Sequence, residues 1–195
     1  MGNLQSVINA LDYLGIESEI VSDPKKIESA SKIILPGVGS FNQAMQNIKL
    51  MGLYEPICEV ALNKKNPVLG ICLGMQLLTK SSDEDGYKEG FGFIDSKITK
   101  FDLDRSYTVP HVGFNSVNVN KNNSTLFKGL SDSSDFYFVH SYRMDYSDKP
   151  FSAGITEYGE KFTAAFEQDN IFGAQFHPEK SQSNGLKILE NFAKL

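Results

Sequence analysis

Tryptophan is absent from this chain of 195 residues, cysteine occurs only twice and histidine only three times. Two cysteines cannot form the disulfide framework of a small secreted domain. Three dispersed histidines, without a cysteine cluster, do not have the spacing of a zinc site. No apolar run approaches the roughly 20 residues that a helix needs to cross a bilayer. We therefore expect no metal, no cofactor and no contact with a membrane.

Basic residues are outnumbered by acidic ones. The chain has 19 lysines and arginines against 24 aspartates and glutamates, which gives a net charge of −5. This balance argues against a nucleic-acid partner. Hydrophobic residues make up 41% of the sequence, which is enough to build the core of one domain over residues 1–195. No signal peptide is recognisable, so we expect a cytoplasmic protein in which Cys58 and Cys72 are both reduced.

The first part of the chain alternates helical and strand patterns. Helices are predicted over residues 4–14, from Asp23-Pro24, over 41–50 and over 54–64, and strands over 16–21, 32–35 and 67–69. Such alternation predicts an α/β fold with a mainly parallel central sheet flanked by helices. Additional antiparallel strands, closely spaced in the sequence, are predicted over 94–101, 113–119, 136–145, 151–156, 162–167 and 171–176. A final helix is predicted over 181–195. The acidic run 81–85 is interpreted as a solvated loop.

Cys72 lies at the junction of a predicted strand and a predicted helix, with Gly70 and Gly74 on either side. A nucleophile on such a sharp turn is held with its side chain accessible, as in the G-x-S-x-G elbow, here written with cysteine. A helix N-terminus beside the sulfur favours the thiolate. The alternative is a cysteine that only packs in the core.

His177 and Glu179 follow an apolar strand pattern near the C-terminus, separated by Pro178. In an extended chain residues i and i+2 face the same way, so the imidazole and the carboxylate can project together. A catalytic cysteine requires a base, and the base requires an acceptor that orients it. A lone His-x-Glu is more often a surface pair, but its combination with the Cys72 turn favours a Cys-His-Glu triad.

Five segments together carry a family resemblance: residues 35–41, 70–76, 109–115, 137–142 and 175–181. They resemble the class I, or triad, glutamine amidotransferases, and among these the HisH-type glutaminase subunits of imidazole glycerol phosphate synthases. The resemblance extends along the whole chain. It implies the class I glutamine amidotransferase fold, L-glutamine as substrate, and a HisF-type (β/α)₈-barrel cyclase as partner in a heterodimer of histidine biosynthesis that forms imidazole glycerol phosphate and AICAR.

The resemblance also assigns roles to individual residues. Cys72 is the nucleophile, His177 the base and Glu179 the group that orients it. The remaining candidates comprise the oxyanion backbone at Gly37, Val38, Gly39 and Leu73, the glutamine pocket at Gly74, Gln76, His140, Ser141 and Tyr142, and the partner interface at Lys180, Phe114, Asn115, Tyr137 and Asn3. From the residues alone, the oxyanion segment could equally be a tight turn that requires glycine, and the pocket residues could be structural.

Two departures from the family pattern stand out. The family's first strand, which precedes its Asn-Leu turn, is missing from the sequence, and Phe114 stands where a tryptophan is usual. Phe114 and Arg143, at positions where many HisH chains carry other residues, keep open one alternative, a HisH paralogue that supplies ammonia for amidation of a surface sugar. A more distant alternative is a non-catalytic glutamine-sensing or scaffold protein, and a cysteine peptidase is less favoured because residues 35–41 and 140–142 match glutaminases.

Overall fold

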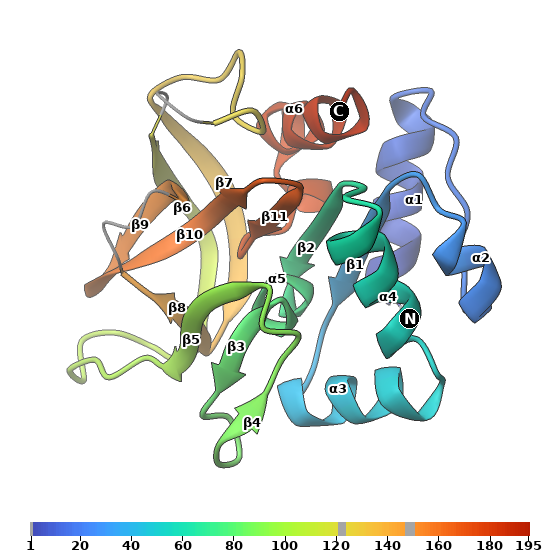
Figure 1. Ribbon diagram of the computed structural model, residues 1–195. Helices are drawn as coiled ribbons and strands as arrows, with labels where there is room; N and C mark the ends of the chain where they lie inside the picture. The colour runs from blue at the N-terminus through green and yellow to red at the C-terminus, as the bar shows by residue number, and fades with distance from the viewer. Residues whose placement is uncertain (1, 121–123, 147–150) are drawn as a thin grey trace.

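A computed structural model of the chain describes residues 2–120, 124–146 and 151–195. In Figure 1 the helices α1 to α4 lie beside β1 and β2, whereas β5, β6, β8 and β9 lie on the opposite side of the molecule. The helical elements are α1 (Gly2–Tyr13), α2 (Pro24–Glu28), α3 (Phe41–Leu50), α4 (Tyr54–Cys58) with the π-helix η1 (Glu59–Asn63), α5 (Leu73–Leu77), the 3-10 turn η3 (Pro178–Lys180) and α6 (Gln182–Ala193). The strands are β1 (Ile33–Gly37), β2 (Val68–Cys72), β3 (Thr79–Ser82), β4 (Lys88–Glu89), β5 (Ile94–Lys100), β6 (His111–Val119), β7 (Ser133–His140), β8 (Tyr142–Asp145), β9 (Ser152–Tyr158), β10 (Glu160–Gln168) and β11 (Ile171–Ala174).

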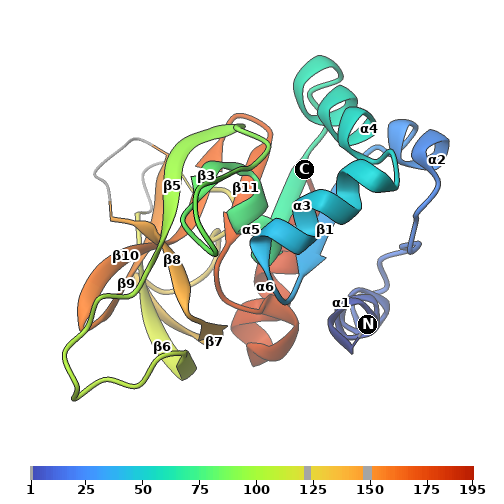
Figure 2. The ribbon, with the colours of Figure 1, turned by 90° about the horizontal axis from the view of Figure 1, so that it is seen from below.

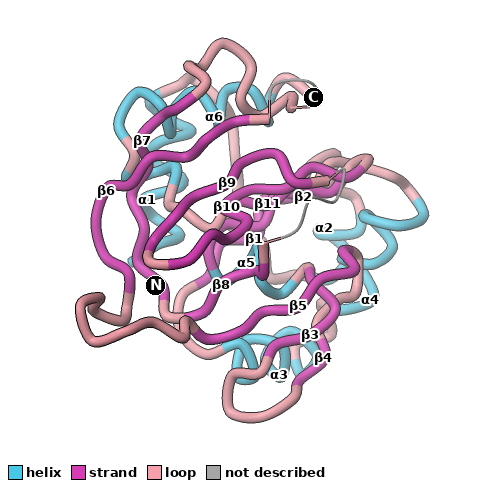
Figure 3. The backbone as a smooth tube through the Cα atoms, turned by 90° about the vertical axis from the view of Figure 1, so that its left-hand side faces the viewer, coloured by secondary structure: helices cyan, strands magenta, loops and turns pink. Residues whose placement is uncertain are grey.

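The strand order is β1-β2-β11-β10-β8-β5-β3-β4, and β9 continues from β10 to β6, which pairs with β7. Figure 3 shows how the ribbon of β9, β6 and β7 curls away from the rest of the sheet. The strands β1, β2 and β11 are parallel, as are β3 and β5. The predicted α/β fold is confirmed. Its antiparallel part is larger than the sequence suggested, because tight turns such as the one at Gly159 can join only antiparallel neighbours.

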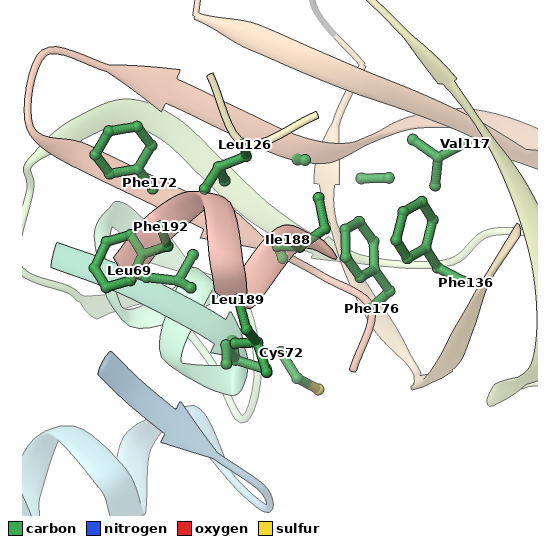
Figure 4. Close-up of a cluster of buried hydrophobic side chains, with 14 of the residues drawn as sticks. Leu69, Cys72, Val117, Leu126, Phe136, Phe172, Phe176, Ile188, Leu189 and Phe192 are labelled. Atoms are coloured by element: carbon green, nitrogen blue, oxygen red, sulfur yellow. The ribbon is translucent and has the colours of Figure 1, made fainter. Parts of the chain in front are cut away.

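Side chains of β2 alternate between two cores. Leu69 and Ile71 belong to a cluster with α1, α6 and the phenylalanines of the curled strands, whereas Val68 belongs to a cluster with α2, α3 and α4. Figure 2 shows α3 and α4 on one side of β1, with α1 and α6 on the other. Cys72 lies at the edge of the first cluster, where β2 ends (Figure 4). The strand that carries the candidate nucleophile is therefore held on both faces.

Local signals placed several elements correctly. The predicted helix over 4–14 corresponds to α1, after which Gly15 adopts φ +71°. Asp23 caps α2 as predicted, since its side chain accepts a hydrogen bond of 3.0 Å from the Lys25 amide. The predicted helix over 41–50 coincides with α3.

The predicted strand over residues 16–21 is wrong. These residues form no ladder, because β1 is the end strand of the described sheet and pairs only with β2. An extended segment becomes a strand only when a neighbour satisfies its amide and carbonyl groups. Without such a neighbour, Ile20 is 53% exposed.

The interpretation of residues 81–85 as a solvated loop is only partly right. Ser81 and Ser82 are buried in β3, between β4 and β5. Glu84 accepts a hydrogen bond of 2.6 Å from the Phe41 amide, so it neutralises one free N–H at the start of α3. Only Asp83 and Asp85 are exposed.

Among the residues that the structure describes, no helix is long and apolar enough to cross a membrane.

Candidate active site

Cys72 occupies a strained corner between β2 and α5. Its backbone has φ 53° and ψ −110°, a region that costs a non-glycine residue on the order of 1–3 kcal/mol. Parallel ladders hold the corner, because Cys72 pairs with Gly37 of β1 and the preceding Ile71 pairs with Ala174 of β11. The side chain is 6% exposed. The surrounding sheet thus fixes the sulfur at the carboxyl end of the parallel strands, as the elbow predicts.

Two glycines let α5 fold back against the sheet. A Cβ on Gly74 would lie 1.6 Å from the Leu35 carbonyl oxygen, and a Cβ on Gly70 would lie 2.5 Å from the Met75 amide nitrogen. Neither contact is possible for a side chain, so this close approach of helix and strands requires glycine at both positions. Packing alone accounts for Gly74, and its predicted place in a glutamine pocket stays a prediction.

His177 and Glu179 form a buried pair. The imidazole Nδ1 lies 2.8 Å from Glu179 Oε1, and both side chains are fully inaccessible to solvent. The carboxylate accepts, so Nδ1 carries the proton and Nε2 is the atom left for proton exchange. Strand alternation predicted that the two side chains project together, but β11 ends at Ala174 and Glu179 lies in the 3-10 turn η3. A turn, rather than an extended strand, brings the two side chains together.

The main chain of His177 is anchored to β7. Its amide donates to the Tyr137 carbonyl at 2.9 Å. The Ser181 hydroxyl donates to the His177 carbonyl at 2.6 Å and accepts from the Tyr137 amide at 2.9 Å. These bonds fix the segment that follows β11 against the curled part of the sheet.

Opposing influences act on the pKa of His177. Burial lowers it, but hydrogen bonds and charge interactions with Cys72 and Glu179 outweigh burial and raise it to about 9. The imidazole is then protonated at neutral pH, beside the thiol group. An imidazolium next to a cysteine sulfur is the arrangement that stabilises a nucleophilic thiolate.

The predicted oxyanion residues lie beside Cys72. Gly37 is its neighbour in the ladder, and a Cβ on Gly37 would lie 3.2 Å from Leu73 Cβ. Val38 is 58% exposed, and Gly39 has φ +102°. The structure therefore brings the 37–39 backbone and the first turn of α5 together, while the role of their N–H groups as oxyanion donors stays a prediction.

The other predicted pocket residues meet where one expected strand breaks in two. The sequence predicted a single strand over 136–145, but Ser141 interrupts it: β7, which ends at His140, pairs with β6, whereas β8 pairs with β5 and β10. Gln76 reaches this break, because its Nε2 donates to the Tyr142 carbonyl at 3.0 Å. His140 Nδ1 lies 2.9 Å from the same carbonyl.

Most predicted interface residues gather around Tyr137. The Lys180 ammonium lies 5.7 Å from the centre of the Tyr137 ring, and the Phe114 ring, which is 51% exposed, lies 5.6 Å from it. Asn115 is on the same strand as Phe114 and donates to the Glu157 carbonyl at 3.0 Å. Asn3 lies in the first turn of α1, apart from this group in sequence, and its side chain is outside the described residues.

Sequence reasoning missed a buried amide. Gln175 is fully buried, and its Nε2 lies 3.8 Å from the Cys72 sulfur. Its place two residues before His177 was the available signal, since such residues of an extended chain share a face.

The pairing of the pocket candidate His140 with His111 in the core was also missed. His111 Nδ1 lies 3.1 Å from His140 Nε2. Burial lowers the pKa of His111 to about 4 and that of His140 to about 3, so both are neutral at physiological pH.

Among residues 2–120, 124–146 and 151–195, no group of three His, Cys, Asp or Glu side chains could hold a metal ion.

Comparisons with known proteins agree with this geometry. The family model described as "Glutamine amidotransferase class-I" matches residues 1–195. The chain is 46% identical, over all of its length and 96% of the relative, to imidazole glycerol phosphate synthase subunit HisH 1 of Campylobacter jejuni (strain 81-176). It is 49% identical, over all of its length and 94% of the relative, to subunit HisH of Sulfurimonas denitrificans.

Solved structures agree at the level of the fold. A crystal structure of a glutamine amidotransferase superposes with a TM-score of 0.74 at 18% identity, covering 98% of this chain and 94% of that one. The PurLQS structure from Thermotoga maritima gives a TM-score of 0.73 at 17% identity, covering 97% and 91% of the two chains. The full-length family match and the identity to these relatives show that the chain belongs to the class-I glutamine amidotransferase family.

Proposed function

We propose that this chain hydrolyses L-glutamine to glutamate and ammonia as the glutaminase subunit of an imidazole glycerol phosphate synthase. The observation that carries the proposal is the Cys72 corner next to the buried His177–Glu179 pair. The names of the relatives support the pathway, since both proteins reported above are HisH subunits of that synthase. These names favour histidine biosynthesis over amidation of a surface sugar.

Each residue has one task in the proposed reaction. The Cys72 sulfur attacks the side-chain carboxamide carbon of glutamine, and the proton of the thiol resides on His177. Backbone N–H groups at residues 37–39 and Leu73 stabilise the oxyanion. His177 returns its proton to the leaving ammonia while Glu179 keeps the imidazole oriented. Water then hydrolyses the thioester, which releases glutamate and restores Cys72.

The proposed partner is a HisF-type (β/α)₈-barrel cyclase that uses the ammonia to form imidazole glycerol phosphate and AICAR. The cluster of Lys180, Tyr137 and Phe114 next to η3 supports a partner face on this side, because Lys180 adjoins the triad carboxylate. A cytoplasmic location belongs to the same proposal; both cysteines are free in the structure, as a reducing compartment requires.

The test is to purify the chain together with a HisF-type cyclase and to compare product formation from glutamine with formation from ammonium salts. Cys72→Ala should abolish the glutamine-dependent reaction and leave the ammonium-dependent reaction intact, because the ammonia-using site lies on the other subunit. The proposal is wrong if the wild-type complex releases no glutamate from glutamine when the cyclase ligand is present. Equal loss of both reactions in Cys72→Ala would also contradict it.

A further inference from the structure

A relay of buried amides reaches the Cys72 sulfur from the side of β8. Gln175 Nε2 lies 3.8 Å from Sγ, and Gln175 Oε1 accepts a hydrogen bond of 3.0 Å from Gln76 Nε2. Gln76 Nε2 also donates to the Tyr142 carbonyl at 3.0 Å. Gln175 is fully buried and Gln76 is 5% exposed. The triad mechanism uses neither side chain.

The chemistry of the Tyr142 carbonyl fixes the direction of this relay. A carbonyl oxygen only accepts, so the Gln76 side chain must turn its NH₂ group toward it. The second N–H of that group then points at Gln175, which must present its oxygen. The Gln175 NH₂ group consequently faces Cys72, so the Gln175 side chain offers the sulfur a donor at 3.8 Å, while the Val139 carbonyl lies 3.9 Å from the sulfur and accepts from the thiol.

A second arm fixes the same carbonyl from the other side. His140 Nδ1 must donate to Tyr142 O, at 2.9 Å, which makes its Nε2 the acceptor for His111 Nδ1 at 3.1 Å. Both rings are buried, at 6% and 3% exposure, and burial lowers both pKa values far enough to keep them neutral. The histidine pair thus holds the carbonyl on which the amide relay depends.

We propose that Gln175 donates a hydrogen bond to the Cys72 sulfur whenever this sulfur is anionic, and that Gln76 is a positioning residue that acts through Gln175. The sulfur is anionic before it attacks and again when it leaves the thioester. A hydrogen-bond donor next to the sulfur stabilises the thiolate, whereas an acceptor at the same position destabilises it. The catalytic consequence rests on the proposed glutaminase function, whereas the donor contact does not.

Two variants of Gln175 test the donor. Gln175→Met keeps the length of the side chain and removes the donor. Gln175→Glu can still accept a hydrogen bond from Gln76 but turns a carboxylate oxygen toward the sulfur. Asn191→Leu is the control. It removes a buried amide that donates to the Leu126 and Lys128 carbonyls at 2.7 and 2.8 Å, outside this relay.

The experiment measures the rate of alkylation by iodoacetamide against pH, with the Cys72 and Cys58 peptides quantified separately by mass spectrometry. Besides Cys72, the titratable and charged groups around the site are His177 and Glu179 after β11, His140 of β7 with its partner His111 of β6, and Arg143 of β8, whereas the residues of α5 and β1 include none. The midpoint of the curve of Cys72 alkylation rate against pH should rise by about one pH unit in Gln175→Met. This shift is the equivalent of losing one hydrogen bond to a charged atom. It should rise further in Gln175→Glu.

Cys58 provides an internal reference, because it is half-buried on α4 and outside the relay. Its profile should stay unchanged in every variant, as should the Cys72 profile in Asn191→Leu. A Cys72 midpoint that is the same in the wild type and in whichever Gln175 variant folds would overturn the proposal. An equal shift in Asn191→Leu would also overturn it, because general destabilisation would then explain the effect.

Glutamine kinetics of the complex separate this proposal from the proposed function. In Gln175→Met and Gln76→Met, kcat should fall about tenfold while KM stays nearly constant, since the lost contact is to the sulfur. A rise of KM alone in Gln76→Met would contradict the positioning role and favour a glutamine-pocket contact. If the wild-type complex does not hydrolyse glutamine at all, the proposed function fails, and the alkylation midpoints still decide whether Gln175 donates to Cys72.

Discussion

Substitution of Gly74 by alanine tests the packing that creates the strained corner. The added methyl group would lie 1.6 Å from the Leu35 carbonyl oxygen, where real Cβ atoms essentially never come closer than 3.0 Å. The contacting atom is backbone of β1, so no side-chain rotation relieves the clash. Helix α5 and β1 must instead move apart, although all five residues of α5 are buried.

The expected loss of unfolding free energy for Gly74→Ala is about 3 kcal/mol or more, above the usual range for overpacking because a whole buried turn must shift. Alanine has a better helix propensity by roughly 1 kcal/mol, which acts in the opposite direction and makes the sign of the result informative. Gly37→Ala is the matched comparison. Its methyl group would meet Leu73 Cβ at 3.2 Å, a distance that small adjustments accommodate, so a loss of about 1 kcal/mol is expected.

The measurement is chemical denaturation monitored by circular dichroism. Both variants are analysed with the same m value, the slope of unfolding free energy against denaturant concentration. Thermal midpoints should follow the same order. If Gly74→Ala proves as stable as the wild type, or more stable than Gly37→Ala, the close approach of α5 to β1 is not what holds Cys72 in its strained conformation.

Three further predictions concern the charged and polar groups around the site. Glu179→Gln should lower the pKa of His177 from about 9, measured by NMR of the imidazole, and should reduce glutamine turnover without reaching the baseline of Cys72→Ala; an unchanged pKa would contradict the orienting role. Burial lowers the pKa of His140 to about 3. On acidification, His140 is therefore protonated at a higher pH in the unfolded chain than in the folded protein. The free energy of unfolding should then fall as the pH drops from about 6.5 toward 4, by up to about 1.4 kcal/mol per pH unit from this group, and His140→Phe should lose that part of the slope; an identical slope would argue against a neutral buried His140. Lys180→Ala removes an exposed cation–π contact with Tyr137 and should change stability by less than about 1 kcal/mol, yet weaken binding of the cyclase in a titration; unchanged affinity and coupling would show that this face is not the interface.

Short-range signals in the sequence determined much of the framework. The spacing of apolar residues predicted α1 and α6, and an Asp-Pro pair predicted the capped start of α2. The glycines around Cys72 predicted a sharp corner, and the structure has one, with φ 53°. These features depend on hydrogen bonds and steric limits within a few residues, which any chain with the same local sequence experiences.

The tertiary structure alone decided which segments became strands and what faces the sulfur. Residues 16–21 have a strand pattern but no neighbour at the free edge of β1, whereas Ser81 and Ser82 look solvated in sequence yet are buried between β4 and β5. The amide of Gln175 is turned toward Cys72 because Gln76, 99 residues away in the chain, is itself oriented by the main chain of β8. Such outcomes depend on partners that are distant in sequence, because hydrogen bonding in a buried site is satisfied by whatever group the fold brings near.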